Sequence, residues 1–436
     1  MKKLFLGLTL LVSGLSASQA QQKIKYVEYD LPNGLHVILH EDHTTPIVAV
    51  SVMYHVGSKN EDPSRTGFAH FFEHLMFEGS ENIPRGEFSN YVEKAGGALN
   101  ANTSQDRTFY YDLLPSNQLE LGIWLESERL MHAKVDSVGI ATQREVVKEE
   151  KRQRVDNQPY GTFQAEIMKH AYTEHPYKWT PIGSMEDLDA AEEIDYVNFY
   201  KKFYVPNNAC LSISGDLNIK ETKKLIAAYF SDIPKGEEIV RPSIVEPMKD
   251  KQIRDTIYDN IQLPAVMMAF HSPALGTDDA YAMEMVSSVL SQGSSSRLHK
   301  RIIETEEKAM YVGAFPFPLE DPGVFIALSI INADVAPDSV EYIISEEVTK
   351  LQNELITEEE YQKLQNQIEN NIVSTTSSQA GIAENLAQYY MYYGNTKLIN
   401  TEIKKYQAVS REDIMAVAKK YLTINNSVVL YYLPKQ

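Results

Sequence analysis

The chain has 436 residues, of which 43% are hydrophobic and 23% are charged, with 21 glycines and 19 prolines. This composition is typical of a folded protein and excludes disordered, collagen-like and low-complexity chains, while the length favours two or more domains. The 41 lysines and arginines against 60 aspartates and glutamates give a net charge of -19, which argues against nucleic acid as the main partner.

The first twenty residues have the pattern of a secretory signal peptide. Two lysines precede an apolar stretch over 4–15, and Ser18 and Ala20 place small residues where a signal peptidase cuts. The apolar stretch is too short to span a membrane, and no later stretch is apolar enough to do so. We therefore predict cleavage after Ala20, a periplasmic or secreted location, and no transmembrane anchor in the mature chain.

Strand and helix patterns alternate through the first half. Residues 34–39 and 47–53 are rich in β-branched side chains, which predicts two strands. Amphipathic spacing then predicts four helices, over 67–77, 87–95, 116–132 and 143–155.

The second half repeats features of the first at an offset of 218 residues. Lys201-Lys202 returns as Lys419-Lys420, and Asn207-Asn208 returns as Asn425-Asn426, each before a hydrophobic strand pattern. Matches at one common spacing favour an internal duplication.

We therefore predict two α+β domains of similar size, each with a sheet and helices packed on it. Three prolines within 234–247 interrupt a polar stretch and mark the connector between them. The predicted division is a signal peptide at 1–20, an N-terminal domain at 21–235 and a C-terminal domain at 236–436.

A metal-binding pattern lies in the first predicted helix. His70 and His74 are about one turn apart, so both imidazoles project from one face and can bind one zinc ion. Glu73 shares that face and can take a proton from a zinc-bound water without occupying the metal. The order His-x-x-Glu-His is the inverzincin signature. The alternative is a pair of ordinary histidines, each satisfied at the surface or in the core.

A catalytic zinc needs a third protein ligand and an open position. Cys210 is the single cysteine, so a metal site here must use histidine and carboxylate. The acidic segment 143–152 offers Glu145, Glu149 and Glu150, and spacing alone does not choose between them. By its charge pattern this segment is more often a solvated helix face.

The combined motifs resemble the pitrilysin/insulinase family of zinc peptidases, in the branch of the mitochondrial processing peptidase beta subunit and short bacterial members. The matching segments are 70–80, 96–103, 144–150, 215–216 and 294–298. The resemblance implies a half clamshell of two homologous domains, each a mostly antiparallel sheet with helices packed on it. It also implies a zinc metalloendopeptidase with one zinc ion per chain, held by His70, His74 and Glu150, and with Glu73 as general base.

The resemblance further implies how substrate binds. An unfolded peptide would add as a strand to a sheet edge near 98–103, where Leu99, Asn100 and Ala101 contact it. Tyr311 matches a tyrosine that clamps substrate near the zinc. For Asn100 the alternative is ordinary turn chemistry at a strand end.

Two positions depart from the family pattern. The family usually carries a second glutamate seven residues before the third ligand, and here that position is Gln143, which can still support the site by hydrogen bonding. Many members carry an arginine seven residues before the clamp tyrosine, and here that position is Glu304. Arg297 and Arg301 lie nearby but out of register, and we interpret them as helix-surface charges.

The second half lacks a copy of the metal motif. An offset of 218 from the four motif residues reaches Ser288, Ser291, Gln292 and Ile368, which predicts a metal-free copy. Short family members resemble half of a four-domain clamshell, so we expect a dimer. It would be a homodimer or a heterodimer with a metal-less homologous subunit that supplies the missing arginine. The alternative function is a non-catalytic peptide-binding or scaffold subunit of such a peptidase complex.

Overall fold

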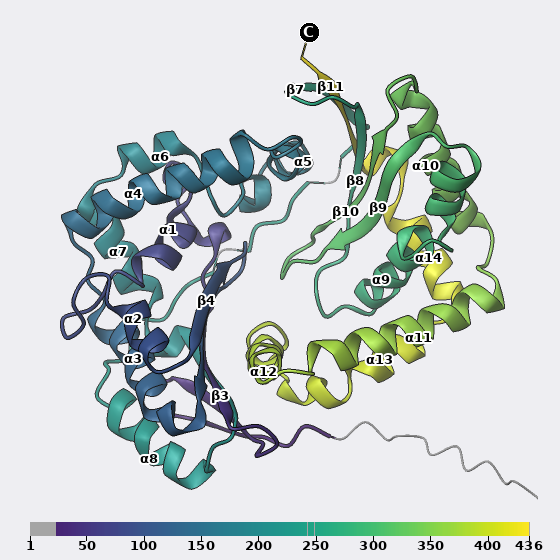
Figure 1. Cartoon of the computed structure of the whole chain (residues 1–436). Coiled ribbons are helices and arrows are strands. Elements are labelled where there is room, and N and C mark those ends of the chain that lie inside the picture. Colours follow the sequence, from purple (N-terminus) through teal and green to yellow (C-terminus); the bar gives the residue numbers. More distant parts are fainter. Residues whose placement is uncertain (1–22, 242, 248, 436) are drawn as a thin grey trace, which may run out of the picture.

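The computed structural model describes residues 23–241, 243–247 and 249–435 (Figure 1). The predicted signal peptide at 1–20 lies outside these residues. In the described part of the chain, no helix combines the length and the apolar character needed to cross a membrane.

The first half is built on a six-stranded sheet in the order β1-β2-β6-β3-β5-β4. Its strands are β1 (Val27–Asp30), β2 (His36–Glu41), β3 (Ile47–Tyr54), β4 (Ala98–Thr103), β5 (Thr108–Pro115) and β6 (Ala209–Gly215). β2 and β6 run parallel, and every other pair of neighbours is antiparallel. β4 forms one edge of this sheet and, among the residues that the structure describes, pairs with β5 alone.

The second half is built on a five-stranded sheet in the order β7-β11-β8-β10-β9. Its strands are β7 (Ile253–Asp259), β8 (Ala265–His271), β9 (Ala309–Phe317), β10 (Val324–Ile331) and β11 (Ser427–Pro434). β7 and β11 are the parallel pair, and the remaining pairs are antiparallel. The structure therefore confirms the predicted α+β fold with mostly antiparallel sheets.

The helices of the first half are α1 (Phe68–Leu75), α2 (Phe88–Lys94), α3 (Leu119–His132), α4 (Ser137–Lys151), α5 (Phe163–Ala171), α6 (Met185–Ala190), α7 (Glu193–Phe203) and α8 (Ile219–Phe230). Those of the second half are α9 (Asp278–Ser291), α10 (Pro337–Asn353), α11 (Glu358–Thr375), α12 (Gln379–Tyr393), α13 (Glu402–Ala408) and α14 (Arg411–Tyr421). α4 begins six residues before the predicted helix, because Asp136 caps it by accepting a 2.9 Å hydrogen bond from the amide of Gly139.

The predicted repeat is visible in the elements themselves. β3, β6 and α7 begin at residues 47, 209 and 193, and their counterparts β8, β11 and α14 begin at residues 265, 427 and 411. Each pair is separated by the offset found between the two Asn-Asn motifs. The two sheets also share one strand order once β1 is set aside, since β2-β6-β3-β5-β4 corresponds to β7-β11-β8-β10-β9. The two halves are structural copies.

Each sheet is covered on its second face by a helix from the other half (Figure 1). Alternate residues of β2 serve two cores: Val37 packs among the helices of the first half, while Ile38 packs against Leu386 of α12. On the second sheet, Met267 of β8 packs with Ile167 of α5. The halves are therefore interlocked through α5 and α12 and share buried surface.

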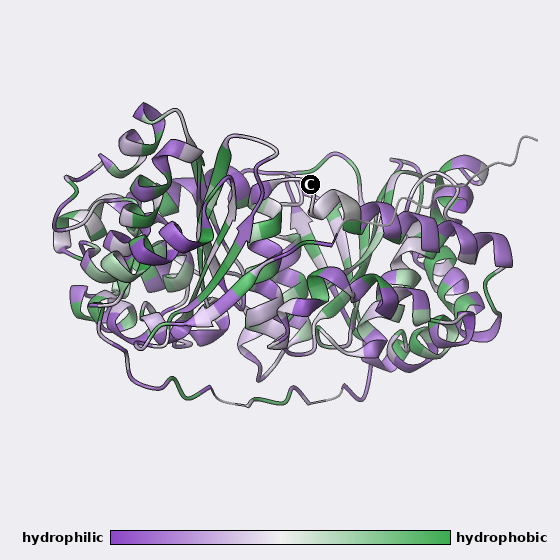
Figure 2. Cartoon of the chain, turned by 90° about the horizontal axis from the view of Figure 1, so that it is seen from below, coloured by the Kyte–Doolittle hydropathy of each residue, from purple (hydrophilic) through white to green (hydrophobic). Residues whose placement is uncertain are grey.

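A connector joins the halves, and its described residues 234–241, 243–247 and 249–252 form no helix or strand; in Figure 2 these parts run along the outside of the molecule. The boundary at 235/236 falls inside it, and the two domains remain a proposal as folding units. A charged cluster also joins the halves. Nζ of Lys59 lies 2.8 Å from Asp106 and pairs with Glu320 of the second half, which in turn lies 3.0 Å from Nε2 of His55.

Candidate metal centre

The helix α1 places two histidines and a glutamate beside the first sheet. Phe68, Phe71 and Phe72 are buried in the core and fix the orientation of the helix. The helix begins after Gly67, whose φ of 94° and close approach to the carbonyl of Ile182 exclude a side chain. The polar positions 70, 73 and 74 are consequently held away from the phenylalanine core, on a common side of the helix.

The helix α4 supplies the third group. Nε2 of His74 lies 2.9 Å from Oε2 of Glu150, and Nε2 of His70 lies 3.6 Å from the same oxygen. The two imidazole rings are 4.8 Å apart and nearly perpendicular. One ligand atom from each of these three residues lies within 4.8 Å of the others. The structure thus brings together His70, His74 and Glu150.

The other two acidic candidates on α4 are directed elsewhere. Glu149 pairs with Arg152 at 2.7 Å, and the side chain of Glu145 is 69% exposed and lies 3.7 Å from Lys148. Geometry therefore selects Glu150 among the three glutamates that the sequence left open. α4 runs on into a single π-helical turn over Arg152–Asp156, directly after this residue.

The three groups fit a zinc ion by their chemistry. Oε2 of Glu150 is buried and makes no hydrogen bond of normal geometry, although two imidazoles approach it. A buried carboxylate oxygen in that state lacks the partner that compensates its lost hydration. Two imidazole nitrogens and one carboxylate oxygen are the ligand set of many catalytic zinc sites, which keep the fourth position open.

The local electrostatics favour the protonation states that a metal requires. Burial, followed by the charge of His74, lowers the pKa of His70 to about 4. The contact with His74 holds the pKa of Glu150 below its usual value, against the effect of burial. Near neutral pH the His70 imidazole is therefore neutral and Glu150 is ionised, and both can act as ligands.

Glu73 projects from α1 toward the edge strand β4. Its Oε2 accepts a 2.6 Å hydrogen bond from the hydroxyl of Thr103, the last residue of β4. Burial raises the pKa of Glu73 even though this hydrogen bond acts in the opposite direction. A carboxylate that is partly desolvated and held in place has the character of a general base.

The predicted substrate residues Leu99, Asn100 and Ala101 lie on β4. They pair with β5 on one side, and in the described part of the chain no strand pairs with the other side of β4. Asn100 is exposed, while Leu99 and Ala101 are half-buried against the helices. Arg107 links the β4–β5 turn to α12, since it binds Asn102 of β4 and lies 2.9 Å from Glu384.

The predicted clamp residue Tyr311 lies on β9, the edge strand of the second sheet, and its side chain is 48% exposed. Within the described residues nothing joins it to the metal group. Glu304, at the position of the family arginine, lies 3.5 Å from His299. Arg297 donates two hydrogen bonds to Glu360. Arg301 pairs with three carboxylates, those of Glu306, Glu346 and Glu347. Both arginines that are out of register are therefore engaged in ion pairs.

Gln143, which the sequence predicts to support the metal site, is bonded to the segment that follows α1. Its side-chain amide donates a 2.5 Å hydrogen bond to Glu78, which follows α1 and also pairs with Arg85. Within the described residues no hydrogen bond joins Gln143 to His70, His74 or Glu150, and its supporting role stays a prediction.

The second half has no equivalent group. Ser288, Ser291, Gln292 and Ile368 occupy the corresponding positions, and none of them offers an imidazole or carboxylate. In the parts of the chain that the structure describes, the only group of three metal-capable residues is the one in the first half.

Two supporting residues had no recognisable signal in the sequence. Glu61 accepts hydrogen bonds from the amides of Gly67 and Ala69, at 3.0 and 2.8 Å, and so caps the start of α1. Arg129 is fully buried, binds Glu126, and donates to the carbonyl of Met76 just after the helix end. Both are ordinary charged residues far from the motif in sequence, and a spacing pattern does not mark them.

Comparison with known proteins places this geometry in context. Residues 36–183 match the family described as "Insulinase (Peptidase family M16)", and residues 195–368 match the "Peptidase M16 inactive domain". A protein named "Zinc protease PqqE" from Helicobacter pylori is 29% identical over 439 residues, covering 99% of this chain and 99% of that protein. A probable mitochondrial-processing peptidase subunit beta from Arabidopsis thaliana is 24% identical, covering 90% of this chain and 75% of that protein.

A crystal structure of a protease from Helicobacter pylori has the same architecture. It superposes with a TM-score of 0.89 at 27% identity, covering 94% of this chain and 100% of that chain. The match to the "inactive domain" description begins after the metal group and runs through most of the second half, where the described residues hold no metal cluster.

Proposed function

Because the chain belongs to the insulinase (peptidase M16) family, which includes relatives named zinc proteases, we propose that it is a zinc metalloendopeptidase acting on unfolded peptides. The convergence of His70, His74 and Glu150 within 4.8 Å, beside the held carboxylate of Glu73, carries this proposal. A non-catalytic subunit would be expected to have lost a ligand or the base, and here all four residues are present.

We assign one zinc ion per chain to the three converging residues. When bound there, zinc supplies a Lewis acid that polarises the scissile carbonyl group and makes a water molecule more acidic. Because the two imidazoles are neutral and the one carboxylate offsets only part of the charge of a bound Zn²⁺, the occupied site would keep a net positive charge. That charge suits a developing oxyanion.

Glu73 moves the proton. Because the Thr103 hydroxyl occupies Oε2, Oε1 is the atom that accepts a proton from the attacking water. The same carboxyl group then gives that proton to the leaving amine nitrogen. Its pKa, raised by burial, makes Glu73 a stronger base for the first of these transfers.

The open edge of β4 orients the peptide. A peptide laid along this edge would hydrogen-bond to the backbone of Leu99, Asn100 and Ala101 as an added strand, so its affinity would depend little on its sequence. Thr103 ends the same strand and holds Glu73, so a bound peptide would extend toward the base. We place Tyr311 on the opposite side of the substrate as a second contact.

The direct test is hydrolysis of a pool of unstructured peptides by the purified mature protein. We expect cleavage that disappears with a chelator and returns with zinc. Peptides left intact under all three conditions would favour the non-catalytic subunit.

We propose that the working enzyme is a dimer. The family arginine is replaced by Glu304, so a second, metal-less homologous subunit that supplies an arginine would complete the clamp. A homodimer is the alternative. Purification from the native source that returns this chain alone, as a fully active dimer, would remove the heterodimer.

We also propose that the protein is exported to the periplasm or secreted. The proposal depends on the signal-peptide pattern over 1–20. Sequencing of the mature N-terminus is expected to begin at Gln21. A mature protein that retains Met1 would contradict export by this route.

A further inference from the structure

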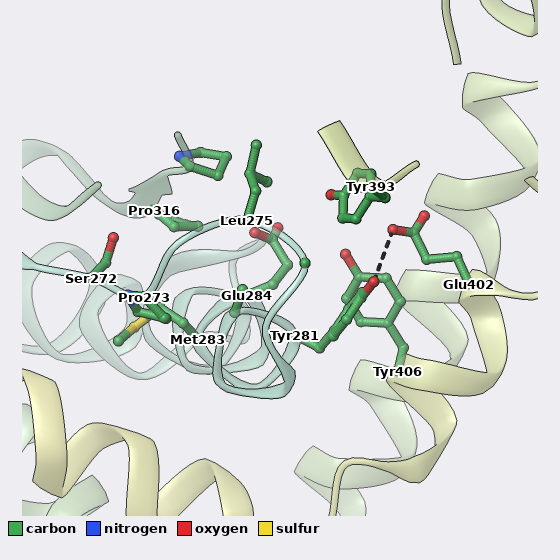
Figure 3. Close-up of a pocket in the computed structure, with 13 residues that line it drawn as sticks. Ser272, Pro273, Leu275, Tyr281, Met283, Glu284, Pro316, Tyr393, Glu402 and Tyr406 are labelled. Atoms are coloured by element: carbon green, nitrogen blue, oxygen red, sulfur yellow. Dashed lines mark hydrogen bonds between the residues drawn. The ribbon is translucent and has the colours of Figure 1, made fainter. Parts of the chain in front are cut away.

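A hollow of about 80 Å³ in the second half has no residue in common with the candidate metal centre (Figure 3). It lies between the first turns of α9, the end of α12 and the start of α13, with the loop at 272–276 and the end of β9 closing it. This volume is below that of pockets that hold drug-sized ligands, and it suits the end of one side chain or a small amine.

Three tyrosines form much of its wall. The rings of Tyr281 and Tyr406 meet edge to face, with centroids 4.8 Å apart. The edge of the Tyr393 ring lies close to Gly276, where an added Cβ would come within 2.7 Å of a ring carbon. Aromatic faces gathered around one space attract cations through their quadrupoles.

Two carboxylates share this space. Glu402 accepts a hydrogen bond from Tyr389 and, at 3.5 Å, from Tyr281. In Figure 3 the hydroxyl groups of Tyr281 and Tyr406 lie between Glu402 and Glu284. After burial, the negative charges of Glu402 and then Glu284 contribute to raising the pKa of Tyr406, so both carboxylates act on one hydroxyl.

The carboxylate of Glu284 is the group in this hollow whose partner is missing among the described residues. It is half-buried on α9, and no described residue donates a hydrogen bond to its carboxylate or pairs with it as a cation. Burial raises the pKa of Glu284, and no described group counteracts that effect. The Glu284 oxygens keep some access to solvent, but the carboxylate is partly desolvated, and a ligand that brings a positive charge would offset the cost of that burial.

The chemistry of the wall selects the kind of cation. The lining residues include neither lysine nor arginine, so the positive charge must come from outside. Two carboxylates and three aromatic faces are a poor donor set for a metal ion, and the described residues hold one three-ligand metal group, which lies elsewhere. An ammonium group has three donors pointing in different directions and also interacts with aromatic faces.

We propose that this hollow binds a primary ammonium group, carried either by the lysine side chain of a peptide or by a free amine. The proposal does not depend on peptidase activity, because every group that carries it belongs to the second half.

Met283 provides a local reporter, since it lines the hollow and is buried. The protein would carry ¹³C-labelled methionine methyl groups, with the Met283 signal assigned by Met283→Leu. The probes are n-butylammonium, with 1-butanol as its neutral counterpart, and the peptide acetyl-Gly-Gly-Lys-Gly-Gly-amide, with norleucine in place of lysine as control. Peptide titrations use Glu73→Gln, so that cleavage does not interfere.

We expect butylammonium to shift the Met283 signal saturably and 1-butanol to leave it unchanged. Glu284→Gln should weaken this binding at least tenfold, while Glu412→Gln, an equal change of charge at an exposed position on α14, should not alter it. Because Glu284 has no hydrogen-bond or ion-pair partner among the described residues, its replacement removes no such contact there, and an unchanged unfolding temperature checks that the variant is folded.

The two probes distinguish the sources of the cation. A shift with the lysine peptide and none with the norleucine peptide assigns the hollow to peptide side chains, whereas a shift with butylammonium alone assigns it to free amines. An unchanged Met283 signal with both probes overturns the proposal. An equal response to 1-butanol, or undiminished binding by Glu284→Gln, overturns it as well.

Discussion

The hydroxyl of Thr103 donates a 2.6 Å hydrogen bond to Oε2 of Glu73 and so joins the edge strand β4 to the helix α1. The strand that we propose as the peptide's binding edge is therefore also the element that orients the proposed base. A carboxylate on a helix face can adopt several rotamers, and this hydrogen bond favours one of them.

Replacing Thr103 with valine tests whether this hydrogen bond positions Glu73. We expect kcat to fall about tenfold, with KM and zinc content nearly unchanged, because the variant keeps the shape of the side chain and loses the donor. Steady-state kinetics and metal analysis measure this split. Thr103→Ser keeps the hydroxyl and should restore most of kcat. A rise in KM with kcat unchanged would place Thr103 in peptide binding instead.

Zinc should stabilise the folded chain through Glu150. Binding to the native state alone contributes RT ln(1 + [Zn]/Kd), or about 4 kcal/mol when zinc exceeds its Kd a thousandfold. We expect a chelator to lower the unfolding temperature of the wild-type protein and to leave that of Glu150→Gln unchanged. The matched control is Glu149→Gln, next in sequence but paired with Arg152 on the surface. If Glu149→Gln lost zinc and Glu150→Gln kept it, our assignment of the third ligand would be wrong.

Arg129 should contribute strongly to stability. Its side chain and that of Glu126 are both 0% exposed, and its guanidinium group lies 4.3 Å from the ring centroids of Phe88 and Tyr110. Arg129→Met leaves the Glu126 carboxylate buried without its cation, which is expected to cost about 3–5 kcal/mol in urea unfolding. Adding Glu126→Gln removes the orphaned charge, so the double variant should be more stable than the single one. Equal or lower stability of the double variant would contradict this interpretation.

The charged cluster between the halves should make stability depend on pH. Burial acts to raise the pKa of Glu320, but the hydrogen bond and charge of His55 and the Lys59 ammonium outweigh it and hold the value at about 2. Because this pKa is depressed below the unfolded value of 4.5, its stabilisation is complete above pH 4.5 and is lost as the pH falls toward 2. The shift corresponds to a contribution of about 3 kcal/mol.

Unfolding temperatures measured between pH 7 and pH 2 test this dependence. Glu320→Gln should be less stable than the wild type at pH 7, and the difference should shrink as the pH falls. Glu193→Gln, at an exposed position on α7, serves as the control and should follow the wild-type curve. A difference that stays constant over the whole range would show that Glu320 acts by packing and not by its charge.

The fold was predictable to the extent that it depends on local pattern and on the repeat. Both Asn-Asn motifs lie before a central strand in the structure, and the strands begin at residues 209 and 427, as the offset requires. The crossing of α5 and α12 onto the opposite sheets was not predictable, because contacts such as Ile38 with Leu386 join residues far apart in sequence and leave no periodic signal.

The placement of the two proposed histidine ligands was predictable, because one helical turn fixes the spacing of His70 and His74. The proposed third ligand lies on a separate helix, and the spacing of Glu145, Glu149 and Glu150 admits more than one choice. The packing of α4 against α1 determines which of these glutamates faces the two histidines, since Val147 of α4 is buried in the same core as Leu75 of α1. Thr103 was missed because a threonine at the end of a strand has no distinctive pattern.

The most direct test of the account compares wild type and Glu73→Gln at equal zinc content. Both proteins are purified in mature form together with any subunit that they retain, loaded with zinc, and given the same pool of unstructured peptides. We expect one zinc per chain in both, cleavage by the wild type, and a rate about a thousandfold lower for Glu73→Gln. Intact peptides with the zinc-loaded wild type, or equal cleavage by both proteins, would contradict the proposal that this chain is a zinc peptidase with Glu73 as its base.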